Sequence, residues 1–515
     1  MLVKTFCAAI NGLEVTTITV EVSITRGVHY HLTGLGDAAV RESHDRIAAA
    51  LLNTGYKFPV ADITVNLAPA DLRKEGSSFD LPLAIAILAA NEKMNCDNLQ
   101  RYMMVGELSL DGSLQPIKGA LPIAIRARAE HFDGLIVPKA NEREAAVVDT
   151  LKVYGMNNLV EVISFLNGTT SFEPCIVDTR KEFYEHQYNF DLDFADVKGQ
   201  ESVKRALEVA AAGGHNLIMI GPPGSGKSMM AKRLPSILPP LTLAESLETT
   251  QIHSIAGKLN NHTGLISQRP FRAPHHTISE VALVGGGQTP MPGEISLAHN
   301  GVLFADELPE FNKHTLEVLR QPLEDRLITI SRARYTVTFP CSFMFVASMN
   351  PCPCGYYGDP NHHCVCTPGQ IQNYMNKISG PLLDRIDIQC SITPVPFQAI
   401  SKAAPGEPSS AIRQRVMAAR ATQSARYKNY KGIHCNAQMS ERLIHQYAQP
   451  DDNGLSMLRS AMEKLGLSAR AYSRILKVAR TIADLAGSEN IRTEHLAEAI
   501  SYRELDRGDW AERGS

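Results

Sequence analysis

Apolar and polar residues change their period several times along the chain, which predicts a succession of strands and helices. Residues 15–23 alternate with period two, as a half-buried strand does, whereas residues 38–52 place apolar side chains on one helical face. Residues 82–90 are apolar on every side, which predicts a buried helix. Further strands are predicted at 30–35, 63–67, 103–108 and 134–138, and a further helix at 122–130. Residues 1–168 are therefore expected to form one α+β domain.

The period changes again in the rest of the chain. Residues 169–192 show no clear period and predict a linker, and residues 193–402 combine short apolar strands with helices, as an α/β core does. Within this core, residues 327–339 predict a β-hairpin, and a helix at 313–321 is expected to end before a proline. Residues 403–515 have helical period only. Their helices are predicted at 411–427, 440–447, 456–464, 469–486 and 493–502, with Thr493 as N-cap of the last.

One strand of the core leads into a phosphate-binding pattern. The apolar run 217–220 is followed by residues 221–228, which fit G-x-x-x-x-G-K-[ST], and a helical pattern comes next. Such glycines let backbone N–H groups approach phosphates closely. Lys227 is expected to reach the β- and γ-phosphates of ATP, and the Ser228 hydroxyl to bind Mg²⁺. The predicted nucleotide-binding residues are Gly221, Pro222, Pro223, Gly224, Ser225, Gly226, Lys227 and Ser228.

Two later apolar runs end in polar side chains that suit ATP hydrolysis. Residues 301–307 end in Asp306, expected to hold Mg²⁺ through water, and Glu307, expected to polarise the attacking water. Residues 343–350 end in Asn350, which is placed to sense the γ-phosphate because ligands of open α/β sheets lie at the carboxyl ends of strands. A strand ending in a solvated acidic turn is the alternative for 301–307 taken alone, but its spacing from the phosphate loop favours catalysis.

These elements, in this order, resemble an AAA+ ATPase. Three further stretches resemble the magnesium-chelatase-like ATPases of the YifB/ComM type: Phe271-Arg-Ala-Pro-His-His-Thr-Ile-Ser279, Pro292-Gly-Glu-Ile-Ser-Leu-Ala-His-Asn-Gly301 and Ser379-Gly-Pro-Leu-Leu-Asp-Arg-Ile-Asp387. The resemblance covers nearly the whole chain. It implies a Lon-protease-like N-terminal domain of ribosomal-S5-like fold, then an AAA+ P-loop α/β core with insertions, and last an α-helical lid.

The Lon-like resemblance raises the question of proteolysis. In Lon proteases a lysine on the following helix activates the nucleophilic serine. Ser78 falls near the nucleophile position, but Ile123 stands at the expected lysine position and Lys118 lies several residues earlier. An unactivated serine hydroxyl is a poor nucleophile. We therefore expect this domain to bind or assemble rather than to cleave.

The resemblance also implies arginines that sense phosphate. In AAA+ rings, an arginine at the position of Arg385 stabilises charge at the neighbour's γ-phosphate, which implies a ring-shaped homo-oligomer, expected to be a homohexamer. Arg470 stands where the sensor-2 arginine would contact phosphate within its own subunit, with Arg474 as the alternative. Val197 and Gln200 stand where such proteins line the adenine pocket, although both also suit a core and a cap position.

A cysteine-rich loop follows Asn350. Two C-x-C pairs, nine residues apart, have the thiolates to bind Zn²⁺ tetrahedrally in a structural site. His362 and His363 are substitute ligands, and four free thiols remain the alternative because C-x-C is less typical of zinc sites than C-x₂-C. The predicted zinc ligands are Cys352, Cys354, Cys364 and Cys366.

Composition limits the classes of partner. The net charge is only −3, so any nucleic-acid surface has to be local, as in the channel of a ring. Candidate contacts to DNA phosphates are Lys258 and Arg272 in an insertion, and Arg332 and Arg334 near the hairpin tip. A solvated basic turn that contacts no DNA explains the charges at the hairpin tip equally well. No apolar run reaches the roughly 18 residues of a membrane helix, and the scattered cysteines indicate a reducing cytoplasm.

The resemblance implies a cytoplasmic, ATP-driven DNA helicase that migrates branches while incoming single-stranded DNA is integrated during natural transformation. Its partners would be single-stranded and branched DNA, further copies of itself and recombination proteins. Two alternatives remain: a chelatase motor subunit for metal insertion into a porphyrin, and a regulatory AAA+ scaffold acting on protein partners. The Lon-like domain favours the first reading, because a chelatase motor subunit is expected to begin close to its AAA+ core.

Overall fold

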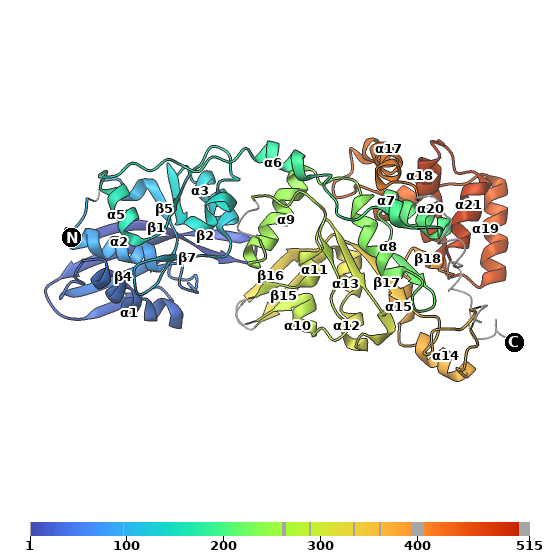
Figure 1. The fold of residues 1–515 in the computed structure, drawn as a ribbon, viewed down its shortest axis with the longest axis horizontal. Coiled ribbons are helices and arrows are strands. Elements are labelled where there is room, and N and C mark those ends of the chain that lie inside the picture. Colours follow the sequence, from blue (N-terminus) through green and yellow to red (C-terminus); the bar gives the residue numbers. More distant parts are fainter. Residues whose placement is uncertain are drawn as a thin grey trace.

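The computed structural model describes residues 2–95, 97–259, 264–287, 290–332, 335–359, 362–393 and 406–503. Figure 1 shows three blocks in a row: a sheet-rich N-terminal block, a central α/β block and a helical block at the C-terminal end. The predicted boundary between core and lid, at 402/403, lies outside the described residues. Across the described part of the chain, no helix combines the length and the apolar character that crossing a membrane requires.

A seven-stranded mixed sheet, in the order β3-β4-β2-β1-β5-β8-β9, organises the N-terminal block. β1 and β2 form a long antiparallel hairpin, whereas β5, β8 and β9 are parallel. The strands are β1 (Leu2–Asn11), β2 (Glu14–Thr25), β3 (Tyr30–Thr33), β4 (Asp62–Ala68), β5 (Tyr102–Met104), β8 (Gly134–Pro138) and β9 (Lys152–Met156), with a separate pair β6 (Glu107–Leu108) and β7 (Leu114–Gln115). β1 was not predicted, because its residues lack regular alternation.

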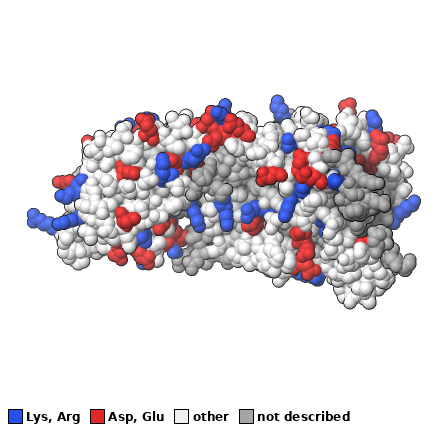
Figure 2. All heavy atoms as spheres, viewed as in Figure 1, with Lys and Arg blue, Asp and Glu red and all other residues white. Residues whose placement is uncertain are grey.

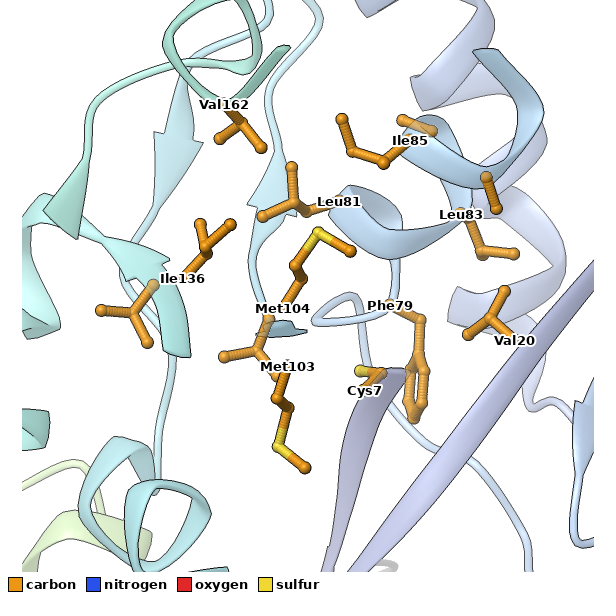
Figure 3. Close-up of a cluster of buried hydrophobic side chains, with 14 of the residues drawn as sticks. Cys7, Val20, Phe79, Leu81, Leu83, Ile85, Met103, Met104, Ile136 and Val162 are labelled. Carbon is orange, nitrogen blue, oxygen red and sulfur yellow. The ribbon is translucent and has the colours of Figure 1, made fainter. Parts of the chain in front are cut away.

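Buried helix α2 (Asp80–Ala90) forms the core of this block. Every residue of α2 is buried, as its uniformly apolar sequence predicts. Figure 3 shows Phe79, the N-cap residue of α2, beside Cys7 of β1, and Leu83 beside Val20 of β2. Asp80, also buried, accepts from Arg46 at 2.8 and 2.9 Å, so that charge is paired. The other helices are α1 (Ala38–Asn53), α3 (Ala120–Ala129), α4 (Glu142–Ala145) and α5 (Leu159–Leu166), with short 3-10 turns η1 (Leu99–Arg101) and η2 (Lys139–Asn141).

A five-stranded parallel sheet, in the order β11-β14-β17-β10-β18, forms the central block. Its strands are β10 (Leu217–Ile220), β11 (Phe271–Arg272), β14 (Val302–Ala305), β17 (Met344–Met349) and β18 (Ile388–Ser391). β10 lies between β17 and β18, so the chain order reverses beside it. Loops that follow β10 and β17 therefore open at the same edge of the sheet, where open α/β sheets bind ligands.

Shorter elements surround this sheet. The helices are α7 (Glu201–Gly213), α8 (Lys227–Arg233), α9 (Leu243–Ile255), α10 (Glu280–Val284), α11 (Glu294–Leu297), α12 (Lys313–Glu317), α13 (Arg320–Asp325), α14 (Pro368–Met375) and α15 (Gly380–Leu383), with 3-10 turns η3 (Phe194–Asp196), η4 (Leu234–Ser236) and η5 (Leu308–Glu310). Two antiparallel pairs stand apart from the main sheet: β12 (Gly285–Gly286) with β13 (Met291–Pro292), and β15 (Leu327–Arg332) with β16 (Tyr335–Pro340). The second pair is the predicted hairpin.

The C-terminal block is helical and shares its core with the central block. One hydrophobic cluster joins Leu207 of α7 to Val416 of α17 and Ile475 of α20. Its elements are α17 (Ser409–Tyr427), η6 (Asn436–Gln438), α18 (Glu441–Tyr447), α19 (Asp452–Leu465), α20 (Ala469–Leu485) and α21 (Thr493–Ser501). The predicted N-cap was wrong by one residue, because Arg492 caps α21 and Thr493 is its first helical residue.

Two other predictions need correction. The linker predicted at 169–192 contains a helix, α6 (Thr179–His186), which Asp178 caps and which buries Phe183. The helix predicted at 313–321 is two short helices, and the second runs through Pro322. Pro322 is tolerated there because it lies in the first turn of α13, where backbone N–H groups need no helical partner.

The N-terminal block contacts two elements of the central block. A Cβ on Gly12, in the β1–β2 turn, would lie 2.2 Å from Cγ1 of Val337 in β16, so turn and hairpin are in close contact. The Gly119 N–H donates to the carbonyl oxygen of Ser254 at 3.2 Å, and the Ser254 hydroxyl donates to Glu144. The hairpin and α9 are therefore both in contact with the first block.

Candidate nucleotide-hydrolysis site

The loop after β10 holds the predicted phosphate-binding residues. Gly224 and Gly226 have φ values of +76° and +91°, which favour glycine. Lys227 begins α8, and its ammonium donates to the carbonyl oxygens of Gly221 at 2.7 Å and Pro222 at 2.9 Å. The loop carbonyl oxygens thus surround the Lys227 ammonium.

Asn350 and Lys227 come together across neighbouring strands. Lys227 Nζ donates to Asn350 Oδ1 at 3.2 Å, so its three hydrogen-bond acceptors are all neutral. Burial lowers the pKa of Lys227, while Asp306 and Glu307 oppose that shift from a distance. A buried ammonium without a hydrogen-bonded carboxylate suits an anionic ligand such as the phosphates of a nucleotide.

Asp306 sits at the end of β14 and accepts two hydroxyl groups. Ser228 Oγ donates to one carboxylate oxygen at 2.7 Å, and Ser348 of β17 donates to the other. Ser348 also accepts the backbone N–H of Glu307 at 3.3 Å. Sequence reasoning missed Ser348, although a serine in an otherwise apolar strand was a usable signal. Hydroxyl and carboxylate oxygens are hard ligands, so Ser228 and Asp306 fit Mg²⁺.

Glu307 is held in an unusual backbone conformation. Its φ of +54° is uncommon for a residue with a side chain and is found most often at functional sites. The side chain is 56% exposed, and its carboxylate lies 3.8 Å from His276 Nδ1. His276 packs against His275 with ring centroids 4.1 Å apart. The sequence assigned no role to His276, which follows β11 and reaches the site only through the fold.

The predicted phosphate-sensing arginines contact carboxylates of their own chain. Arg385 Nη2 donates to Glu324 at 2.6 Å, and its side chain is only 10% exposed. Arg470 Nη1 lies 3.3 Å from Asp384. A finger that serves a neighbouring subunit is expected to need a change from this arrangement, so the assigned roles of Arg385 and Arg470 remain predictions.

The four cysteines of the loop after β17 converge. Their ligand sulfurs lie within 4.8 Å of one another, and three pairs are 3.3, 3.5 and 3.6 Å apart. Zn–S bonds of about 2.3 Å in a tetrahedron require sulfurs about 3.8 Å apart, so the spacing fits Zn²⁺. Burial and the neighbouring thiols raise the pKa of Cys364 to about 12, whereas backbone N–H groups of Tyr356 and Val365 help to lower the pKa of Cys354 to about 6.

The cysteine loop lies against the phosphate loop. A Cβ on Gly355 would come within 2.7 Å of Cδ of Pro223, and Gly355 has a φ of +89°. His362, a proposed substitute ligand, pairs with Asp359 at 3.4 Å. The ligand set that the structure brings together is therefore the four cysteines.

The candidate DNA-binding residues are dispersed. Lys258 is exposed just after α9, whereas Arg272 makes two 2.6 Å hydrogen bonds to Glu294. Arg332 ends β15, and Arg334 lies outside the described residues. Figure 2 shows Lys and Arg side chains in a band across the middle of one face, over the junction of the first two blocks. Arg272 would have to exchange Glu294 for a phosphate.

The Lon-like region has no lysine in the expected place. Ile123 is buried in α3, and the side chain of Lys118 extends toward the central block, where a Cβ on Gly257 would lie 3.0 Å from its Cε. The Ser77 hydroxyl, next to Ser78, donates to Glu107. The expectation that this domain binds or assembles rather than cleaves stays a prediction.

Comparisons with known proteins agree with the fold. A family model described as "Magnesium chelatase, subunit ChlI" matches residues 193–400, and two further ChlI models match residues 20–141 and 406–503. The chain is 44% identical to YifB of Escherichia coli and 43% identical to competence protein ComM of Haemophilus influenzae, over 96% of each chain in both cases. It is also 30% identical over 199 residues to Lon protease 2 of Bacillus subtilis, spanning 34% of this chain and 36% of that protein. The predicted fold class is confirmed.

The geometry of Glu307 generates a testable prediction. Glu307→Gln removes the base but leaves Lys227 and Ser228 in place, so ATP should still bind while turnover falls by about 100-fold or more. Lys227→Ala should instead weaken binding itself. A fluorescent ATP analogue and a phosphate-release assay separate the two effects, and wild-type turnover by Glu307→Gln would contradict the assignment of the base.

Proposed function

The chain belongs to the magnesium-chelatase-like ATPases of the YifB/ComM type, and from this premise we propose that it is an ATP-driven ring motor that moves DNA. In this proposal Mg·ATP binds at residues 221–228, and Glu307 activates the water that attacks the γ-phosphate. Asn350 and Lys227 hold that phosphate in position. Catalysis then consists of positioning and charge stabilisation. Closure around ATP would move the elements that face the DNA channel of the ring.

The observation that carries the ATPase part is the contact between strand ends. These groups come from three segments: Lys227 of α8 bonds to Asn350 after β17 at 3.2 Å, and Ser228 of α8 bonds to Asp306 after β14 at 2.7 Å. Phosphate-binding and metal-binding groups are thereby next to each other. This preorganisation supports phosphoryl transfer, because such enzymes act mainly by position and charge.

The DNA part rests on the family and on the β15–β16 hairpin. The relative from Haemophilus influenzae is named a competence protein, and likeness to it extends over 96% of both chains. We extend that role to this chain as a helicase that migrates branches when transforming DNA is integrated. The β15–β16 hairpin, with Arg332 at the end of β15, and Lys258 after α9 would face the DNA. Recombination proteins would be its further partners, in the cytoplasm.

A chelatase role is the second candidate, because all three matching family models are named for a chelatase subunit. Such a protein would hydrolyse ATP in response to a porphyrin-binding partner and would ignore DNA. ATPase rates with no addition, with single-stranded DNA and with forked DNA therefore separate the two candidates.

The hairpin provides the test of DNA handling. Replacing Arg332 and Arg334 with Ala should weaken DNA binding at every sequence, because phosphate contacts carry no base information. The slope of log affinity against log salt should shrink by about 1.4 for two lost single-strand contacts. Unwinding of a forked substrate should be lost, while ATP hydrolysis without DNA continues.

The matched control removes the same charge from the lid. Arg459→Ala with Lys464→Ala on α19, both exposed, should leave DNA affinity and unwinding unchanged. If the wild-type protein neither binds DNA nor responds to it at low salt, the helicase proposal is wrong.

We also propose that the four cysteines hold a structural Zn²⁺ through their sulfurs. Zinc would supply cross-linking of the loop between Asn350 and α14, with no open position for a reacting group. Purified reduced protein should contain about one zinc per chain, and Cys364→Ser should lower the midpoint of thermal unfolding. Elemental analysis and calorimetry measure both; metal-free protein with unchanged stability would contradict the proposal.

A further inference from the structure

Residues 384–387, which we call the finger segment, lie at the amino edge of the central sheet. β10 pairs with β18 from Leu217 opposite Ile388, so Asp387 lies beside the amino end of β10. The phosphate loop begins at the carboxyl end of the same strand. A four-residue strand is about 13 Å long, and the finger segment is therefore separated from the phosphate loop of its own subunit by the length of β10.

Asp387 is the most heavily bonded residue of this segment. It is 1% exposed, and its carboxylate accepts from Arg474 Nη1, from His215 Nδ1 at 3.2 Å and from the Asn216 N–H at 3.3 Å. Burial opposes its ionisation, but Arg474 and His215 outweigh burial and hold the pKa of Asp387 well below its usual range. The carboxylate therefore stays charged and paired, and removing one partner would leave a buried charge uncompensated.

Arg474 belongs to lid helix α20, which touches the finger segment at several points. His215 Nε2 lies 2.8 Å from Thr481 Oγ1, also on α20. One turn before Arg474, Arg470 lies 3.3 Å from Asp384. Residues four apart on a helix share a face. One face of α20 thus binds Asp384 through Arg470 and Asp387 through Arg474, on either side of Arg385.

Arg385 is fixed at its backbone but incompletely bonded at its tip. Its carbonyl oxygen accepts from Asn216 Nδ2 at 2.9 Å, so the segment is tied to the entry of β10. Its guanidinium donates to Glu324 and to the Pro381 carbonyl oxygen, both at 2.6 Å, while Nε has no partner among the described residues. The side chain can change partners while the backbone keeps its place, which α20 holds from one side through Asp387 and Asp384.

We propose that Arg474 is a positioning residue for Arg385, and that its bond to Asp387 makes the lid of one subunit set how Arg385 meets the neighbouring subunit's ATP. The inference rests on the proposed ATP-driven ring. It gives Arg474 a role in trans, acting through Asp387, in place of phosphate contact within its own subunit.

Mixed rings test the direction of this effect. Subunits carrying Glu307→Gln bind ATP, do not hydrolyse it and still offer Arg385 to their neighbours. Three inactive proteins, which we call dopants, are each mixed in rising excess with wild-type protein. They carry Glu307→Gln alone, Glu307→Gln with Arg385→Ala, and Glu307→Gln with Arg474→Gln. We expect the last two to lower turnover per wild-type subunit by about tenfold or more relative to the first, since small misplacement is costly. The KM for ATP of the wild-type subunits should not change.

A role in cis gives a different result. The dopant's own site is already inactive, so Arg474→Gln would then add nothing to Glu307→Gln, and the inference would be overturned. Size-exclusion chromatography with ATP and thermal unfolding confirm that each dopant folds and enters rings. An Arg474→Lys dopant, which retains the charge, should restore part of the neighbours' turnover.

Asp387→Asn separates positioning from direct phosphate contact by Arg474 in trans. If Arg474 acts through Asp387, Asp387→Asn in the dopant should produce the same loss, and combining the two changes should add no more. Independent, additive losses would overturn the inference. Wild-type protein that forms rings but hydrolyses no ATP would overturn the proposed function and this inference together, whereas active rings with no trans effect overturn the inference alone.

Discussion

The position of β10 between β17 and β18 is the constraint on which the site depends. Register places Ile220 opposite Met349, so the phosphate loop and Asn350 leave the sheet at the same level. That alignment places the Lys227 ammonium within hydrogen-bond distance of the Asn350 amide oxygen. The same strand, at its other end, fixes Asn216 and His215 against the finger segment. The short buried strand β10 thus positions the phosphate loop at its carboxyl end and the finger segment at its amino end.

Local patterns predicted the parts of the site that are encoded locally. The phosphate loop, the acidic strand end and Asn350 each lie at the end of an apolar run, and periodicity found most helices of the lid. Predictions were wrong or absent where long-range contacts decide: α6 is helical partly because Phe183 packs inward, and β1 needs β2 as partner.

Roles created by the fold were invisible for the same reason. His276 meets Glu307 across 31 positions of sequence, and Arg474 meets Asp387 across 87. No spacing rule predicts such pairs. Ser348 differs, because its polar side chain in an apolar strand was visible and was overlooked. The family resemblance pointed to Arg385 and Arg470, but not to Glu324 and Asp384, the carboxylates that they contact.

The contact between Gly12 and Val337 limits how this protein can be taken apart. Because the turn has no room for a side chain there, the first block and the hairpin present fitted surfaces to each other. A shortened protein that starts after residue 168 would lack Gly12 and Leu13. One side of the hairpin would then be uncovered, and the apolar cluster that contains Val337, against which Leu13 packs, would face water. Chimaeras that exchange the first block between relatives would therefore have to carry the hairpin with it, so the two form one unit of exchange despite lying more than three hundred residues apart.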